Sequence, residues 1–207
     1  MTTREAGRGT AGGDAAAFRA KLATRHPPLW EALVQDARLA ARYRGERAQF
    51  HSRPDAVGQM VRLALVSDAF LAQALYRAKA RLQALGIPLV PRLLHRLAMV
   101  TGQVAIGDPV IVEPGVYIAH GQVVIDGLCE IATGVVIFPF VTIGLRAGDV
   151  RGPKVGERAS IGTGAKLIGP ITVGAGARVG ANAVVVDDVP PDVTVVGSPA
   201  RVVDTRA

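Results

Sequence analysis

The chain of 207 residues contains few aromatic residues and a single cysteine. Phe, Trp and Tyr make up 4% of the sequence although 49% of it is hydrophobic, so a core must consist of aliphatic residues and alanine. This composition favours a narrow structure filled by Val, Ile and Ala over a β-sandwich or an ordinary α/β sheet. Cys129 cannot form a disulfide within the chain, which is consistent with a reducing compartment.

Other common signals are absent as well. No apolar run reaches the roughly 20 residues of a membrane span, the N-terminus has no signal-peptide core, and no GxxxxGK(S/T) motif indicates a P-loop. The net charge is +7, but no basic run is interleaved with aromatic residues. Solvated arginine and attraction for a phosphate-bearing cofactor explain this charge better than nucleic acid does. We expect a cytoplasmic protein with no membrane or nucleic-acid partner.

A repeat of six residues runs from residue 155 to residue 190, as VGERAS, IGTGAK, LIGPIT, VGAGAR, VGANAV and VVDDVP. A period of six fits neither an α-helix nor the alternation of a long β-strand. It is the signature of a parallel β-helix, in which each hexad forms one short strand and one turn. The aliphatic place that points into the coil is held by Val155, Ile161, Leu167, Val173, Val179 and Val185, and a second apolar place by Ala159, Ala165, Ile171, Ala177, Ala183 and Val189.

The same hexads begin at Ile106, and a first interruption divides them. Ile118 and Ile125 occupy equivalent aliphatic places but are seven residues apart rather than six. The repeat therefore slips by one residue near His120. An extra residue of this kind is expected to act like a β-bulge, and bulges often redirect a side chain toward a site.

A second interruption is the segment GLRAGDVRGPK, residues 144–154. Asp149 stands there in a place where the hexads require an aliphatic residue. Because a glycine-rich, charged segment without an inward anchor cannot continue the coil, we expect a loop that leaves it. We predict the functional site at these two interruptions.

The N-terminal part of the chain follows a different pattern. Residues 1–25 contain almost no large apolar side chains and are expected to form a mobile tail. Residues 26–100 show helical periodicity and predict an α-helical cap. Residues 101–207 predict the β-helix domain.

Four helices are expected within this cap. The first covers about residues 29–45, the second follows Pro54, and the third runs from Ser67 or Asp68 to Gly86. A short fourth helix holds the leucines between residues 93 and 97. The apolar side of the third helix is predicted to consist of Phe70, Leu71, Ala74, Leu75, Ala78 and Leu82.

Four histidines are candidates for chemistry, and one of them lies on the coil. His120 is at the one-residue slip, and an imidazole is a suitable general base near neutral pH. His26 and His51 are expected to be solvated, and His95 to be structural. A zinc site needs about three converging histidines, so we predict no metal. Cys129 occupies an inward hexad place, which does not favour a nucleophilic role.

The segments GVYIAHGQVVIDG, VTIG, GPKVGERASIGTGAKLIG, VGANAVVVDDVP and VVGSPARVV resemble the serine O-acetyltransferase family of hexapeptide acyltransferases. The resemblance extends from about Asp68 to Val203 and is strongest beyond Ile106. It implies a left-handed parallel β-helix, usually trimeric, that binds acetyl-CoA between neighbouring coils. A helical cap before the coil agrees with this resemblance.

The resemblance also implies a site. His120 matches the family's catalytic base, which deprotonates the acceptor hydroxyl for attack on the thioester. The segments Thr142–Gly144 and Gly162–Lys166 match those that contact CoA, largely through backbone groups. The implied CoA-binding residues are Thr142, Gly144, Gly162, Gly164, Ala165 and Lys166.

Three positions depart from the family pattern. Family members carry an aspartate directly before the catalytic histidine, where this chain has Ala119, and an orienting aspartate that aligns with Ala105. The histidine of an HPK motif, which helps hold the substrate's carboxylate, aligns with Gly152. The groups that could orient His120 instead are Asp126, Glu113, Asp108 or a group from a neighbouring subunit.

These observations predict an acetyl-CoA-dependent transfer of an acetyl group to the hydroxyl of serine. Transfer to another small hydroxyl or amine, such as that of a sugar or a biosynthetic intermediate, is the alternative, and a non-catalytic assembly protein is a third hypothesis. We expect a homotrimer or a dimer of trimers, because the coil needs partners to cover its sides. Since the chain lacks the terminal isoleucine tail of many family members, no complex with the next enzyme of cysteine synthesis is expected.

Overall fold

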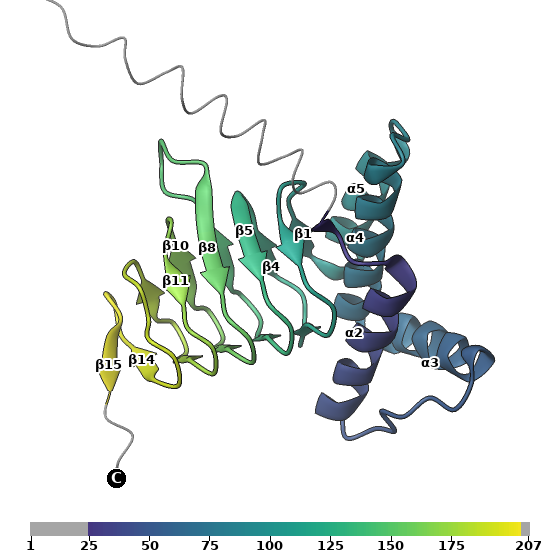
Figure 1. Cartoon of the computed structure of the whole chain (residues 1–207), viewed down its shortest axis with the longest axis horizontal. Helices are drawn as coiled ribbons and strands as arrows, with labels where there is room; N and C mark the ends of the chain where they lie inside the picture. The colour runs from purple at the N-terminus through teal and green to yellow at the C-terminus, as the bar shows by residue number, and fades with distance from the viewer. Residues whose placement is uncertain (1–24, 204–207) are drawn as a thin grey trace, which may run out of the picture.

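The computed structural model describes residues 25–203 and consists of a helical region packed against one end of a parallel β-helix (Figure 1). The predicted mobile tail, apart from Arg25, lies outside the described residues. Helices of about the predicted extent are present, although the fourth is longer than the expected short helix. Their bounds are α2 Leu29–Tyr43, α3 Arg53–Val66, α4 Asp68–Ala84 and α5 Val90–Gly102.

The strands form three sheets, ordered β1-β4-β7-β10-β13, β2-β5-β8-β11 and β3-β6-β9-β12-β14-β15, which are the three faces of the coil. All pairs are parallel except β14 with β15. The strand bounds are β1 Val104–Ile106, β2 Ile111–Val112, β3 Tyr117–Ile118, β4 Val123–Ile125, β5 Leu128–Ile131, β6 Val136–Ile137, β7 Thr142–Gly144, β8 Arg151–Val155, β9 Ser160–Ile161, β10 Lys166–Ile168, β11 Thr172–Val173, β12 Arg178–Val179, β13 Val184–Val185, β14 Thr194–Val196 and β15 Arg201–Val203.

The core of the coil consists of the predicted hexad residues. Each aliphatic place from Ile106 to Val185, and each second place from Val110 to Val189, is buried. These residues form one continuous cluster along the coil. The predicted fold class, a parallel β-helix with an N-terminal helical cap, is therefore confirmed.

Both interruptions of the repeat are visible in the strand register. Ile106 pairs with Ile125, whereas Ile125 pairs with Ile143, so the first coil is one residue longer than the second. Ile143 pairs with Leu167, so the third coil is one hexad longer than the second. Figure 1 shows the chain leaving the coil before β8, as the segment 144–154 predicts.

Helix α4 closes the end of the coil with polar side chains. The N–H groups of each coil donate to carbonyl groups of the following coil, as Glu113 N does to Ile131 O at 2.8 Å. The carbonyl groups of the first coil have no preceding coil, and buried side chains of α4 donate to them instead. These bonds join Gln73 to Val116 O (3.0 Å), Tyr76 to Val110 O (2.8 Å), Arg77 to Glu113 O (2.8 Å) and Lys79 to Ile106 O (2.7 Å).

The predicted apolar side of α4 was therefore largely wrong. Phe70 is buried, but Leu71, Leu75 and Leu82 are only half-buried. Periodicity identifies where apolar residues lie, and it cannot show that unpaired carbonyls on another element require polar partners. The buried positions of α4 are Ala69, Phe70, Ala72, Gln73, Tyr76, Arg77, Lys79 and Ala80.

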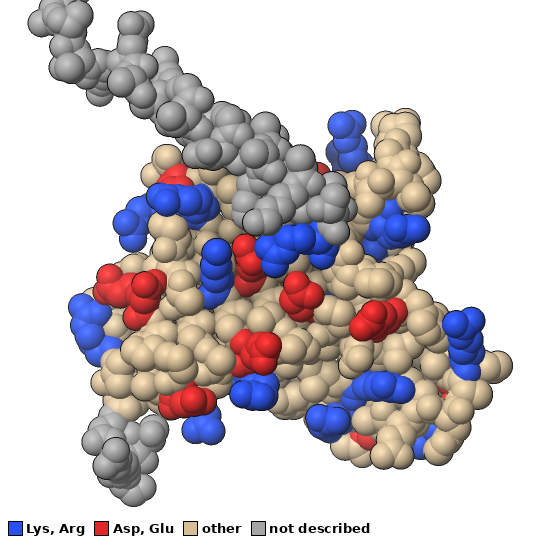
Figure 2. Space-filling view, in the orientation of Figure 1, with Lys and Arg blue, Asp and Glu red and all other residues tan. Residues whose placement is uncertain are grey.

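The surface in Figure 2 carries acidic and basic side chains interspersed, without a continuous basic patch on the face shown. Ion pairs contribute to this mixture, such as Arg25 with Glu130 at 3.1 Å and Arg151 with Asp149 at 2.6 Å. No helix between residues 25 and 203 has the length and apolar character needed to cross a membrane.

Candidate active site

His120 lies in an exposed corner of the first coil, between β3 and β4. In the corners stacked on it, Phe140 (φ 64°) and Gly164 (φ 75°) occupy the left-handed turn position, and Gln122 (φ 62°) occupies it here. The extra residue of this coil therefore falls in the pair formed by His120 and Gly121. The slip that the sequence indicates is thus the corner that carries the histidine.

The end of α5 holds this corner in place. Gln103 O accepts hydrogen bonds from Gln122 N at 2.8 Å and Val123 N at 3.2 Å. A Cβ at Gly121 would lie 2.1 Å from Gly102 O, so only glycine fits this contact. The sequence did not lead us to predict that α5 supports this corner. Gly102 and Gly121 were the only sequence features that pointed to the contact.

The three carboxylates suggested as partners of His120 lie at other corners. Asp108 is in the turn from β1 to β2, Asp126 in the turn from β4 to β5, and Glu113 in the turn from β2 to β3. Asp108 is paired with Lys79 at 3.0 Å. The suggestion that one of them orients His120 within the same chain is therefore wrong, because at least one face of the coil separates each of them from the histidine.

Ala105 and Ala119, which replace two family aspartates, both adjoin this corner. Ala119 directly precedes His120, and Ala105 pairs with Val124 at the start of the next coil. Since their side chains end at Cβ, neither can accept a hydrogen bond from the imidazole.

The two predicted CoA-binding segments lie side by side. Thr142 pairs with Lys166 and Gly144 with Ile168, and Thr142 N donates to Ala165 O at 3.0 Å. The corner of residues 162–165 belongs to the same column of corners as His120, two coils further along. At about 4.8 Å per coil this places it roughly 10 Å from the histidine's corner.

The predicted CoA-binding residues differ in what the fold demands of them. A Cβ at Gly162 would lie 2.7 Å from Val179 O, so stacking of the coils already requires this glycine. Gly164 has a φ of 75°, in the left-handed region that favours glycine. A Cβ at Gly144 would find only ordinary contacts at 4.0 Å, so packing does not explain that glycine. Ala165 is fully buried and can offer only backbone groups.

Gly152 is buried on β8 and packs directly on Cys129. A Cβ at Gly152 would lie 2.2 Å from Cys129 Sγ, so this backbone has no room for a side chain there. The pairing of β5 with β8 is irregular at this point. Cys129 Sγ donates to Asp126 O at 3.1 Å, and burial raises the pKa of the Cys129 thiol to about 12. A thiol in this state is not a nucleophile at neutral pH.

The remaining histidines lie in the helical region. His26 was expected to be solvated, but it is half-buried with its ring edge-on to Tyr76 at 6.4 Å. Burial, with the nearby Arg77 and Lys79, lowers the pKa of His26. His51 is exposed, and burial lowers the pKa of the half-buried His95. Among residues 25–203, no three His, Cys, Asp or Glu side chains gather as a metal site.

The structure thus places an exposed histidine at one corner of the coil and the glycine-containing corner of residues 162–165 in the same column. No family model matches the chain. Individual relatives do match. The serine acetyltransferase of Mycobacterium tuberculosis is 43% identical over 121 residues, which are 54% of this chain and 52% of that protein. The serine acetyltransferase of Escherichia coli is 33% identical over 176 residues, covering 84% of this chain and 64% of that protein.

A solved structure extends this likeness to the fold. The soybean serine acetyltransferase apoenzyme matches with a TM-score of 0.70 and 32% identity, over 87% of this chain and 71% of that chain. The chain belongs to the serine acetyltransferase family, and its coil is left-handed as in those structures. The matched region spans about half the length of the first curated relative.

Proposed function

We propose that the protein is an O-acetyltransferase that transfers the acetyl group of acetyl-CoA to the hydroxyl of serine. The observation that carries this proposal is that the exposed His120 shares a column of corners with residues 162–165, which lead into β10, the strand that pairs with residues 142–144 of β7. Solved serine acetyltransferases with bound serine and with bound CoA support both substrates. The catalytic and CoA-binding residues are part of this proposal.

In the proposed mechanism, His120 removes the proton from the serine hydroxyl as that oxygen attacks the thioester carbonyl. Backbone N–H groups are the donors that such a site can offer to the tetrahedral oxyanion. When the intermediate collapses, the C–S bond breaks and the protonated His120 returns its proton to the departing thiolate. The products are O-acetylserine and CoA.

We further propose a homotrimer, or a dimer of trimers, in the cytoplasm. Residues 105 and 119 are alanines, so neither supplies a carboxylate that could orient His120. Asp108, Glu113 and Asp126 lie at other corners of the same chain, across a face of the coil. In a trimer, a corner of the neighbouring copy can approach the histidine. We also propose that the chain is divided into a tail (1–25), a helical cap (26–100) and a β-helix domain (101–207).

A different acceptor is the second candidate function, and Gly152 favours it. The family's histidine that helps hold the serine carboxylate is absent, and Cys129 occupies the space that a side chain at this position would need. An acceptor without a carboxylate, carrying another small hydroxyl or amine, would not need that histidine.

Thiol release from acetyl-CoA, measured with a panel of acceptors, tests both candidates. Turnover with L-serine supports the first, and turnover only with other acceptors selects the second. His120→Ala should lower turnover at least about a hundredfold, because proton removal is then uncatalysed. His51→Ala, which alters an exposed histidine in the helical region, is the matched control. Near-normal activity of His120→Ala, or no turnover with any acceptor, contradicts the proposal.

A further inference from the structure

The corner between β6 and β7 carries two exposed aromatic rings. Phe138 and Phe140 flank Pro139 and are 36% and 53% exposed. The chain has five phenylalanines, so two of them lie together at one solvent-facing corner. Neighbouring exposed rings form an apolar patch, and such patches mark binding sites more often than single exposed residues do.

The coil does not require a large residue at the place of Phe138. The pairing of β3 with β6 and of β6 with β9 makes Ala119, Phe138 and Gly162 equivalent. Ala119 N donates to Ile137 O at 2.9 Å and Phe138 N to Ile161 O at 3.0 Å, in agreement with this register. The equivalent residues of the adjoining coils are therefore small, and Ala119 directly precedes the candidate base.

The backbone of Phe140 is strained. Its φ is 64°, and Gly164 and Asn182 hold the equivalent left-handed position in the following corners. Glycine and asparagine adopt this region readily, whereas a bulky residue does so at a cost. Strained residues cluster at active sites and ligand-binding segments. Because packing of the coil explains neither the strain nor the exposed ring, a ligand contact is the reason we consider.

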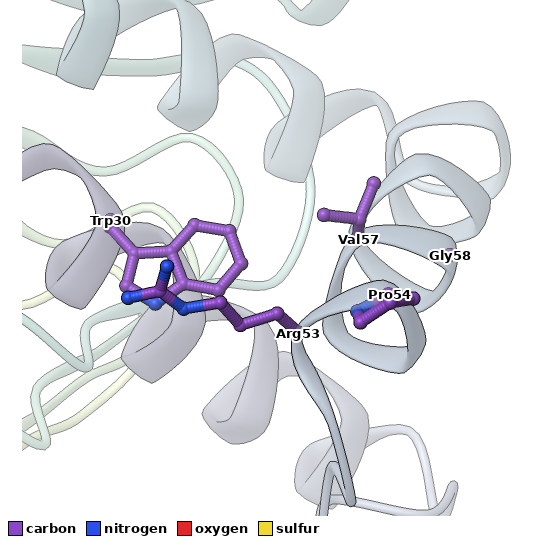
Figure 3. Close-up of a pocket in the computed structure, with 5 residues that line it drawn as sticks. All are labelled: Trp30, Arg53, Pro54, Val57 and Gly58. Atoms are coloured by element: carbon purple, nitrogen blue, oxygen red, sulfur yellow. The ribbon is translucent and has the colours of Figure 1, made fainter.

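An exposed aromatic ring in the helical region is covered differently. Trp30 is 41% exposed in an open pocket, and Figure 3 shows the Arg53 side chain extending over its indole, 5.8 Å from the ring centroid. Within residues 25–203, no cation or second ring lies in this way over either phenylalanine of the β6–β7 corner. Their apolar surface is therefore open to a ligand.

This corner lies between the two parts of the proposed site. It is one coil beyond His120 and one coil before residues 162–165, about 5 Å from each at the usual spacing of strands. A thioester held at residues 162–166 and attacked beside His120 must pass over it. The serine acceptor is polar, with an ammonium and a carboxylate group. The apolar part of the reacting pair is the acyl chain of the donor.

We propose that Phe138 and Phe140 form an apolar wall that binds the acyl group of the donor thioester, so that the protein also transfers groups longer than acetyl, such as butyryl. This inference rests on the proposed function, which supplies the donor and the base. The bonds are those of the acetyl transfer: the bond from the serine oxygen to the acyl carbon forms, the C–S bond breaks, and the proton reaches the thiolate through His120. Each additional methylene group covered by the rings should improve binding about fourfold.

Calorimetry with S-ethyl-CoA and S-butyl-CoA tests the wall without turnover, because these unreactive thioethers differ by two methylene groups. The wild type should bind S-butyl-CoA about tenfold more tightly. Phe138→Ala and Phe140→Asn introduce residues that equivalent places already hold, and each should reduce this ratio to about threefold or less. Arg158→Asn, at a left-handed position (φ 57°) in another column of corners, is the matched control and should keep the ratio. An unchanged ratio in both phenylalanine variants overturns the proposal.

Turnover distinguishes this proposal from the proposed function. With L-serine as acceptor, the ratio of kcat/KM for butyryl-CoA to that for acetyl-CoA should fall about tenfold in the phenylalanine variants. Serine turnover with an unchanged ratio rejects the wall and leaves the proposed function standing. The expected thioether ratios without turnover of any acceptor contradict the proposed function and support the wall. A lower assembly mass of the variants in sedimentation equilibrium would assign the rings to a contact between copies and refute the wall.

Discussion

The regular coil and its junction with the helical region satisfy the same backbone requirement in different ways. In the coil, the carbonyl groups of each turn accept hydrogen bonds from the preceding turn, and the side chains inside are aliphatic. The first coil has no preceding turn, so α4 supplies Gln73, Arg77 and Lys79 as buried donors. Stability therefore rests on apolar packing in one region and on buried polar pairs in the other.

The junction is the more sensitive of the two regions to substitution, because removing one member of a buried pair leaves the other member buried without a partner. Arg77 donates to Asp36 at 2.9 Å, and Asp36 in turn accepts from Gly115 N at 2.9 Å. The four variants below test this comparison, in order of decreasing expected effect.

Arg77→Ala should cost about 3–5 kcal/mol of unfolding free energy, because Asp36 is then a buried charge without its cation. Chemical denaturation at fixed protein concentration measures the loss. Arg178→Ala, an exposed arginine of the coil, is the control and should change stability by no more than about 0.5 kcal/mol. The double variant with Asp36→Ala should lose less than the sum of the single losses. Equal losses for Arg77→Ala and the control would break the comparison.

Gly121→Ala should lower kcat/KM about tenfold or more while the protein stays folded, because displacing a catalytic group by about 1 Å can cost this much. The added Cβ must push the His120 corner away from Gly102 O. Ala181→Ser, at an exposed corner further along the coil, should retain activity. Full activity of Gly121→Ala would show that α5 does not position the histidine.

Ile161→Val should destabilise the coil by about 0.5–1.5 kcal/mol, as is usual for the loss of one buried methylene group. Ile161 is fully buried within the aliphatic stack. Val196→Ala, which removes two carbons from an exposed side chain of the coil, is the control. A loss as large as that of Arg77→Ala would mean that the coil is no more tolerant than the junction.

His26→Gln should reduce the loss of folding stability that occurs as the pH falls. The pKa of His26 is lowered in the folded state, so the unfolded chain binds the proton more readily below the ordinary value of about 6.5. Folding stability contributed by neutral His26 is therefore present above that value and is lost as the pH falls below it. Melting temperatures between about pH 7 and pH 5 should fall less in His26→Gln than in the wild type. The same fall in both would show that burial beside Tyr76 does not matter, and His51→Gln is the control.

The coil was predictable because its information is local and repeated. Each hexad places Ile, Val or Ala where the coil needs it, so the register, the slip at His120 and the loop before β8 follow from counting residues. The junction was not predictable, because Gln73, Arg77 and Lys79 look like surface residues until the first coil is known to lack a partner. The corner of His120 shows both aspects, since the sequence predicts its position and does not predict its contact with Gly102.

The sequence by itself determined the β-helix, the family resemblance and the candidate base His120, because a six-residue period and a short motif survive without knowledge of contacts. Only the tertiary structure decided that α4 closes the coil with donors, that Cys129 fills the space beside Gly152, and that Asp108, Glu113 and Asp126 lie away from His120. Those outcomes depend on residues distant in the sequence meeting in space. A local sequence pattern does not show which distant residues come into contact.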